Sequence, residues 1–358
     1  MGEVERLPVA VIGVGGVGSL TLQGMLRSEA VKVVGIADRN GRVAEQAGKA
    51  AGVPAYGDNR SLLAETRPRA VFLAVPPADA PDLLAACAER GIHVWTESPA
   101  ARNLAEAVAM VRRMEEANLK LAVGTQRRFA AGYRRAWELR NRVGQMFLAR
   151  MRYLFNWGQE LGWRGDRSSA GGGALLELGY HAVDMLVWTL GLPEEVYGCV
   201  AGGSRPGPRV QGEQACPVYD TDDTAAAIFR CRNGCIATVV TTRRSGPVNE
   251  EMAMHGRDGS IVASGDSCLL RDADGNVLDR ISDPSAGAEM FRRQAEAFAT
   301  AVLEDRPKWE CSGRENLMNL AVIEAIYLSD RTRQPEVPLR LLKTNGYTVE
   351  ECLAVRPE

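Results

Sequence analysis

The sequence predicts an α/β protein: an N-terminal domain built on a parallel sheet, and a C-terminal α+β domain built on a large, mostly antiparallel sheet. Three observations carry this prediction. An apolar strand near the N-terminus runs into a glycine-rich turn and a helix, strand and helix patterns then alternate to about residue 126, and strands joined by short turns follow residue 145. At 358 residues the chain is also longer than one hydrophobic core usually serves.

The glycine-rich turn is the most specific local motif. The apolar run 8–12 predicts a buried parallel strand, and the turn follows it directly. Between a strand and a helix, a G-x-G-x-x-G match predicts a dinucleotide site with the pyrophosphate at the helix N-terminus. We therefore expect cofactor contacts from Gly13, Gly15, Gly16, Val17 and Gly18.

The second predicted strand, 31–37, ends at Asp38, twenty residues after Gly18. An acidic side chain at this place binds ribose hydroxyls and repels a 2′-phosphate, which favours NAD over NADP. Arg39 is able to pair with such a phosphate, so NADP stays open. We place both residues at the adenosine end of the cofactor.

The alternation continues to Gln126, with helices expected at 19–28, 42–51, 61–66, 81–90 and 104–117 and further strands at 70–75, 92–96 and 119–124. Two of these strands end at Val75-Pro76 and at Glu97-Ser98-Pro99, at the sheet edge where ligands bind in open α/β folds. We expect a dinucleotide-binding Rossmann domain over residues 1–125 and a second domain over residues 126–358.

The second domain is expected to hold an antiparallel sheet with helices on one face. Its predicted strands are 145–156, 224–232, 235–243, 250–255 and 260–262, its predicted helices are 289–304 and 314–332, residues 202–212 form an exposed loop, and 335–341 is a final extended segment. A sheet covered on one side leaves an apolar face open. We therefore expect a homodimer or homotetramer formed through that face.

A helix is also predicted directly after the three glycines 171–173, which allow a tight turn or close approach to a ligand. Glu177, His181 and Asp184 stand at i, i+4 and i+7 on one face of this otherwise apolar helix. One interpretation makes His181 a general base that carboxylates hold and tune. The other makes it a core histidine satisfied by neighbours on its own helix.

Composition excludes several classes of partner. The 43 basic and 45 acidic residues give a net charge of −2, so nothing indicates a nucleic-acid or membrane-surface partner. The eight cysteines are scattered without zinc-ligand spacing, so we expect reduced thiols and no metal. The N-terminus carries no apolar secretory run and no window approaches the roughly 20 apolar residues of a membrane span, which predicts a cytoplasmic location.

These motifs together resemble the Gfo/Idh/MocA family from about Val9 to Leu339. The resemblance rests on the glycine turn, on Glu97-Ser98-Pro99 where the family typically has Glu-Lys-Pro, on Trp163-Arg164, and on the segment from Gly171 to Asp184. It implies that NAD(P) lies across the first domain with its nicotinamide facing the second sheet. A sugar or polyol would bind between the domains.

The resemblance also implies residue roles. His181 would be the base for a substrate hydroxyl, and Glu177 would help to hold the substrate and the imidazole. Tyr180 and Arg164 would line the same cleft, and Asp184 would either orient His181 or cap local structure. The expected cofactor contacts then also include Val75, Pro76, Glu97 and Gln126.

Two positions depart from the family pattern. Glu177 replaces the usual aspartate and extends the carboxylate by one methylene. Ser98 replaces the usual lysine, which would supply positive charge near a developing alkoxide, and losing one such donor typically costs roughly 3–4 kcal/mol. Either Ser98 itself or an arginine would have to take that role, the candidates being Arg102, Arg127, Arg164 and Arg167.

Three functions remain open on the sequence alone. The first is an NAD(P)-dependent oxidoreductase acting on a hydroxyl of a sugar, amino sugar or cyclitol. The second is an enzyme that keeps NAD bound and oxidises its substrate only transiently, for glycoside cleavage, elimination or epimerisation. The third is a homologue that binds nucleotide or sugar without turnover.

Overall fold

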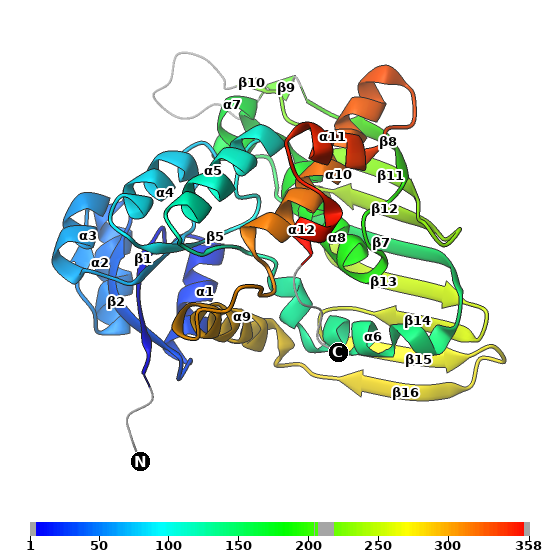
Figure 1. Cartoon of the computed structure of the whole chain (residues 1–358), viewed down its shortest axis with the longest axis horizontal. Helices are drawn as coiled ribbons and strands as arrows, with labels where there is room; N and C mark the ends of the chain where they lie inside the picture. Colours follow the sequence, from blue (N-terminus) through cyan, green and yellow to red (C-terminus); the bar gives the residue numbers. More distant parts are fainter. Residues whose placement is uncertain (1–4, 204, 207–217, 354–358) are drawn as a thin grey trace.

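The computed structural model describes residues 5–203, 205–206 and 218–353. Figure 1 shows two sheets side by side, the first in blue and cyan and the second in green and yellow, with helices packed against both. This arrangement confirms the predicted fold class. The loop expected at 202–212 lies mostly outside the described residues. Within the described part of the chain, no helix is long and apolar enough to cross a membrane.

The first sheet is parallel and has the strand order β3-β2-β1-β4-β5-β6. Its strands are β1 (Leu7–Ile12), β2 (Val31–Ala37), β3 (Ala55–Tyr56), β4 (Ala70–Leu73), β5 (His93–Thr96) and β6 (Leu121–Val123). Helices connect them: α1 (Val17–Leu26), α2 (Gly41–Ala51), α3 (Asn59–Thr66), α4 (Ala80–Ala88) and α5 (Leu104–Glu116). Side chains of Asn40, Asp58 and Asn103 cap α2, α3 and α5 by accepting a backbone N–H, which fixes where these helices begin.

The second sheet has eight strands in the order β16-β15-β14-β13-β7-β12-β11-β8. All neighbours are antiparallel except β12 and β7, which are parallel. The strands are β7 (Met146–Asn156), β8 (Glu195–Ala201), β11 (Thr224–Arg230), β12 (Ile236–Thr242), β13 (Arg244–Gly256), β14 (Gly259–Ala263), β15 (Ser267–Asp272) and β16 (Val277–Ser282). A separate pair joins β9 (Arg205–Pro206) and β10 (Val218–Tyr219).

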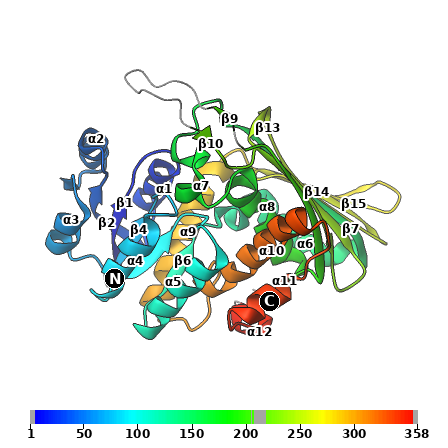
Figure 2. The ribbon, with the colours of Figure 1, turned by 90° about the horizontal axis from the view of Figure 1, so that it is seen from above.

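Helices cover one face of this second sheet (Figure 2). The two central ones are α8 (Ala174–Leu190) and α10 (Gly313–Thr332), and the others in this half are α6 (Ala131–Leu139), α7 (Arg167–Ala170), α11 (Pro338–Thr344) and α12 (Val349–Cys352). One more helix, α9 (Ala286–Leu303), follows the second sheet in sequence. Three short 3-10 helices are η1 (Gln126–Phe129), η2 (Arg140–Val143) and η3 (Gly162–Gly165). The opposite face carries exposed Leu148, Tyr197, Ile228, Ile236 and Val240.

Helix α9 differs from the expectation, because it follows the second sheet in sequence but packs on the first. It contacts α1, β1 and β2. Its buried residues Ala295, Phe298, Ala299 and Val302 belong to the same hydrophobic cluster as Val9, Phe72 and Trp95 of the parallel sheet. Gly24 of α1 makes this contact close, since a Cβ there would lie 2.8 Å from the backbone nitrogen of Arg292.

The structure also differs from the expected elements near the C-terminus and adds elements that were not predicted. The segment 335–341 is not one extended stretch: Glu336 pairs with Val196, and Pro338 then opens helix α11, where a proline is tolerated because its missing N–H would have no partner. Strands β8, β15 and β16 and helix α6 were not predicted. The boundary near residue 126 stays a prediction, with β6 ending just before it at Val123.

Candidate active site

A cavity of about 1410 Å³ lies at the carboxyl ends of the first sheet's strands and extends to β7, α8 and α9. A drug-sized ligand typically occupies a pocket of roughly 300–1,000 Å³, so this cavity has room for a dinucleotide and a second small molecule. The predicted cofactor and catalytic residues all line it: Gly13, Gly15, Gly16, Val17, Gly18, Asp38, Arg39, Val75, Pro76, Glu97, Ser98, Gln126, Glu177 and His181.

The glycine turn fits a dinucleotide phosphate. A Cβ on Gly13, whose φ is +87°, would lie 2.2 Å from the carbonyl oxygen of Ala74, and one on Gly18 would lie 2.3 Å from the oxygen of Gly13. These two glycines therefore allow the turn to pack against its own chain. A Cβ on Gly15 would meet nothing within 4 Å. That open space at the start of α1 leaves room for a pyrophosphate next to the first helical N–H groups.

Asp38 is fixed beside this turn. Its carboxylate accepts hydrogen bonds from the backbone N–H of Val14 at 3.0 Å and of Asn40 at 2.9 Å. Arg39 is exposed at the rim. A half-buried carboxylate held in this way is suited to accept hydrogen bonds from ribose hydroxyls.

The start of α8 is set by a residue far away in sequence. The Asp222 carboxylate accepts hydrogen bonds from the N–H of Gly173 and Leu175, each at 2.8 Å, and from the Tyr327 hydroxyl at 2.7 Å. A Cβ on Gly173 would lie 2.0 Å from the backbone oxygen of Asp222. The glycines before α8 thus allow close packing against other parts of the protein.

Glu177 and His181 lie one turn apart on α8, and both face the cavity while they remain half-buried. Glu177 Oε1 accepts a hydrogen bond from Arg164 Nε at 2.5 Å, and the guanidinium carbon of Arg164 lies 4.3 Å from the ring centre of Trp157 and 4.5 Å from that of Trp163. Burial raises the pKa of Glu177, and Arg164 opposes part of that rise.

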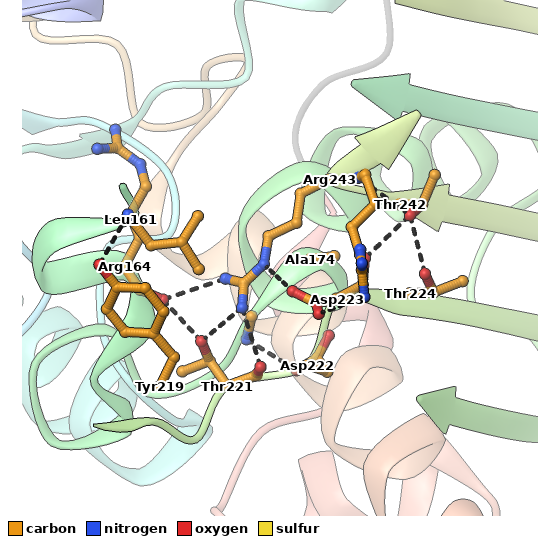
Figure 3. Close-up of polar contacts among 12 residues, drawn as sticks. Leu161, Arg164, Ala174, Tyr219, Thr221, Asp222, Asp223, Thr224, Thr242 and Arg243 are labelled. Atoms are coloured by element: carbon orange, nitrogen blue, oxygen red, sulfur yellow. Dashed lines mark hydrogen bonds and ion pairs between the residues drawn. The ribbon is translucent and has the colours of Figure 1, made fainter. Parts of the chain in front are cut away.

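A buried polar network holds the backbone of Arg164 (Figure 3). Its carbonyl oxygen accepts hydrogen bonds from Thr221 Oγ1 at 2.8 Å and Arg243 Nη1 at 3.2 Å. Arg243 is only 1% exposed and pairs with Asp223 at 2.7 Å. Side chains from the end of β12 and from the 219–223 segment therefore fix the Arg164 wall of the cavity.

His181 is a neutral imidazole near neutral pH. Burial, and secondly the charge of Arg127, lower its pKa to about 3. Its Nδ1 atom is buried without a hydrogen-bond partner, and its ring centre lies 5.8 Å from that of Tyr153. The satisfied core histidine proposed as the alternative is therefore not what the structure shows.

Glu97 and Ser98 also place polar atoms without partners at the cavity wall, namely Glu97 Oε1 and Ser98 Oγ. Burial raises the pKa of Glu97 to about 7, although its other oxygen accepts a hydrogen bond from the N–H of Ser98 at 3.3 Å. Gly124 allows this placement, because a Cβ there would lie 2.7 Å from Glu97 Oε2. The Glu97 side chain can therefore change its charge near neutral pH.

Two predicted substrate residues do not line the cavity. Tyr180 is fully buried and donates a hydrogen bond to Asn316 Oδ1 at 2.7 Å. Asp184 is also fully buried, and its carboxylate pairs with Arg128 at 2.5 Å and accepts a hydrogen bond from Asn319 at 2.7 Å. Asp184 shares a helix face with His181, but it lies almost one turn deeper, where η1 and α10 cover α8. It is paired within the core and is not among the residues that line the cavity.

The four candidate arginines line two different cavities. Arg127 and Arg164 line the cavity, whereas Arg102 and Arg167 line a second cavity of about 660 Å³ near the start of α8. Arg102 is held there by Glu106 at 2.6 Å. No lysine is among the described residues that line the larger cavity.

Aromatic residues of the site were missed. Tyr153, Phe155 and Trp157 line the cavity from the end of β7. Their spacing of two is the signal for one face of a strand, so the sequence carried the information. Across the described part of the chain, no cluster of three or more His, Cys, Asp or Glu side chains has the geometry to hold a metal ion.

Comparison with known proteins shows which family the chain belongs to. Residues 7–125 match the oxidoreductase family with an NAD-binding Rossmann fold, and residues 134–262 match the GFO/IDH/MocA C-terminal domain. The chain belongs to the GFO/IDH/MocA oxidoreductase family. The resemblance inferred from the sequence is thereby confirmed, and with it the prediction of an NAD cofactor.

Relatives within the GFO/IDH/MocA family include several named dehydrogenases. Levoglucosan dehydrogenase of Pseudarthrobacter phenanthrenivorans is 28% identical over 257 residues, which are 63% of each chain, so the match spans less than two thirds of that relative. D-xylose 1-dehydrogenase (NADP(+)) 2 of Haloferax volcanii is 25% identical over 332 residues, 90% of this chain and 97% of that one.

A solved structure of a GFO/IDH/MocA protein has the same fold. Levoglucosan dehydrogenase in complex with NADH and levoglucosan superimposes with a TM-score of 0.83 at 23% identity, covering 93% of this chain and 99% of that chain. This likeness supports both sheets and their arrangement. It assigns no role to individual residues.

Proposed function

We propose that this protein is an NAD-dependent dehydrogenase that oxidises a hydroxyl group of a sugar, amino sugar or cyclitol. One observation carries the proposal: the glycine turn and the imidazole of His181 line a single cavity, although they belong to different halves of the chain. A bound dinucleotide and a neutral base would therefore meet the same substrate.

The residues of the chain fit the steps of such a reaction. When bound, NAD supplies the acceptor for the hydride that leaves the substrate carbon. The glycine turn and Asp38 bind the pyrophosphate and ribose. The His181 imidazole takes the hydroxyl proton, for which its depressed pKa keeps it unprotonated in the resting enzyme. Glu177 and Arg164 orient sugar hydroxyls, and Trp157 offers an apolar face to the ring.

Two alternatives are less well supported. The named relatives considered above are dehydrogenases, which favours net oxidation over transient oxidation. A binding protein without turnover would have no use for a buried imidazole and carboxyl that lack hydrogen-bond partners. NAD is favoured over NADP by the placement of Asp38.

We also propose that two or four copies associate through the open face of the second sheet. Leu148, Tyr197, Ile228, Ile236 and Val240 are each between 37% and 53% exposed there, on four neighbouring strands. A mass in solution equal to a single chain would contradict this. The cytoplasmic location expected from the sequence stays a proposal.

A single-turnover assay tests the main function. Protein with NAD is mixed with a panel of sugars, amino sugars, cyclitols and glycosides, and both reduced nicotinamide and carbohydrate products are followed. We expect reduced cofactor and a keto product in equal amounts from wild type, and none from His181→Asn, which should still bind NAD. Cleaved or isomerised sugar without reduced cofactor would instead establish transient oxidation.

A further inference from the structure

Six buried polar atoms without hydrogen-bond partners belong to residues that line the same cavity. They are Glu97 Oε1, Ser98 Oγ, Gln126 Oε1, Arg127 Nε, Trp157 Nε1 and His181 Nδ1. A buried polar atom left unpaired destabilises the folded protein. A group of six in one cavity therefore indicates that a ligand completes their hydrogen bonds.

Arg127 is the cation of this group, and neighbouring residues fix its position. It lies on η1, directly after the parallel sheet ends. Its Nη2 atom donates a hydrogen bond to the Tyr153 hydroxyl at 2.6 Å and lies 3.1 Å from Glu250 Oε2. Burial works against its charge, but Glu250 and Tyr153 outweigh burial and hold the pKa of the guanidinium above its usual value. One edge of the guanidinium is thus anchored, while Nε remains without a partner.

The other cations of the cavity are placed differently. Arg164 already donates to Glu177 and stacks between two indole rings. Arg39 is exposed beside Asp38, near the glycine turn, and Arg27 is exposed at the far end of α1, near Glu289. Arg127 is the charged group that acts on His181.

We propose that Arg127 is a catalytic residue that places positive charge at the reacting oxygen. It would thereby take the role of the lysine that Ser98 replaces. This inference rests on the proposed function. As the substrate O–H bond breaks, its proton passes to the His181 imidazole. The electron pair left on oxygen forms the carbonyl while the hydride leaves carbon for the nicotinamide. Arg127 stabilises the negative charge that develops on that oxygen.

The first test measures turnover against pH. Arg127→Gln should lower kcat by roughly 100- to 1000-fold, with the affinity for NAD retained. The rising limb of kcat should also move to higher pH. In the wild type the Arg127 cation lowers the pKa of both the alcohol and the imidazole, so both pKa values rise when it is removed. Arg127→Lys should retain much more activity, since the charge remains.

A matched control is needed because Arg127→Gln leaves Glu250 unpaired. The double variant Arg127→Gln/Glu250→Gln removes both charges and protects the fold. It should show the same loss of kcat and the same shift with pH. Wild-type turnover in this double variant would overturn the assignment of Arg127 while leaving the dehydrogenase function intact.

A second readout needs neither cofactor nor turnover. The chain has only three histidines, so a proton NMR titration of the cofactor-free protein can follow each one, with His181→Asn providing the assignment. The rings of Tyr153 on β7 and Tyr180 on its own helix pack near His181, the charge of Arg127 on η1 acts on it, and Glu97, Arg164 and Glu177 line the same cavity. Of these, only Arg127 changes in the double variant, together with its partner Glu250. The pKa of His181 should rise, and an unchanged pKa would overturn the proposal.

Moving the charge provides the sharpest test. Ser98→Lys added to the Arg127→Gln/Glu250→Gln variant should raise kcat at least tenfold, because a cation returns to the same cavity. Failure to recover, together with an unchanged His181 pKa, would show that Arg127 is structural. A wild-type protein that oxidises nothing in the panel would instead overturn the proposed function, and the NMR titration would still decide whether Arg127 acts on His181.

Discussion

Arg164 and Glu177 form an ion pair across one wall of the cavity, with 2.5 Å between Nε and Oε1. The Arg164 guanidinium lies over the rings of Trp157 and Trp163, and the pair is only partly exposed, at 27% for the arginine side chain and 17% for the glutamate. Its partial burial makes it stronger than an ion pair on the open surface. It fixes a carboxylate beside aromatic rings, an arrangement suited to bind a sugar by its hydroxyls and its C–H face.

Glu177→Asp should weaken substrate binding. Removing one methylene withdraws the carboxylate from Arg164 Nε, so both side chains lose their fixed geometry. We expect KM for the sugar to rise about tenfold while the affinity for NAD is unchanged. Steady-state kinetics and an NAD titration measure the two effects. Glu160→Gln, which removes an exposed carboxylate outside the cavity, serves as the control, and an equal effect from it would contradict the role of Glu177.

Gly13→Ala and Gly15→Ala should have opposite consequences. A Cβ at Gly13 collides with the carbonyl of Ala74 at a positive φ, so this variant should lose thermal stability. A Cβ at Gly15 meets open space, so the fold should persist while NAD binding weakens tenfold or more. Thermal unfolding and fluorescence titration with NAD separate the two outcomes. Tight NAD binding by Gly15→Ala would show that the pyrophosphate lies elsewhere.

Asp222→Ala should destabilise the protein by roughly 1–3 kcal/mol, because two N–H groups at the start of α8 and the Tyr327 hydroxyl lose their acceptor. Turnover should fall as well, since this cap positions the helix that carries Glu177 and His181. Urea unfolding measures the free energy. Tyr327→Phe removes only one of the bonds and should cost less. Equal costs for both variants would mean that the helix N–H groups find other partners.

Glu97→Gln should stabilise the cofactor-free protein at alkaline pH. Burial raises the pKa of Glu97 from 4.5 to about 7, so the folded state holds a proton that the unfolded chain releases between these values. The free energy of unfolding therefore falls as pH rises through this window. The variant should be more stable than wild type by roughly 1–2 kcal/mol near pH 8 and equal to it near pH 4. Parallel urea titrations at both pH values decide, and a gain that is the same at both would contradict the raised pKa.

The local motifs allowed most of the cofactor half to be predicted. A strand, a glycine turn and a helix are set by neighbours in sequence, so Gly13 to Gly18 and Asp38 could be placed on one cavity before any tertiary contact was known. The same reasoning placed Glu177 and His181 on one face of a helix. Their shared access to the cavity follows from that spacing.

Long-range contacts account for what the sequence did not reveal. Asp184 has the spacing of a site residue, yet its carboxylate accepts a hydrogen bond in the core from the Arg128 side chain, 56 positions away. The cap on α8 comes from Asp222, 49 positions from Gly173. Arg127 could not be told apart from three other arginines, because only the fold brings it beside Tyr153 and Glu250.

The position of helix α9 limits where the chain can be cut into fragments or exchanged with a relative. The chain completes the parallel sheet, builds the second sheet, and then returns to lay Phe298 and its neighbours against Trp95 and Leu22. A fragment that stops at the end of β6 would expose that apolar surface and so would be prone to aggregate. Exchanging nucleotide-binding halves between relatives therefore requires three crossover points, one after β6 and one on each side of α9, so that the donor's sheet arrives with the helix that matches it.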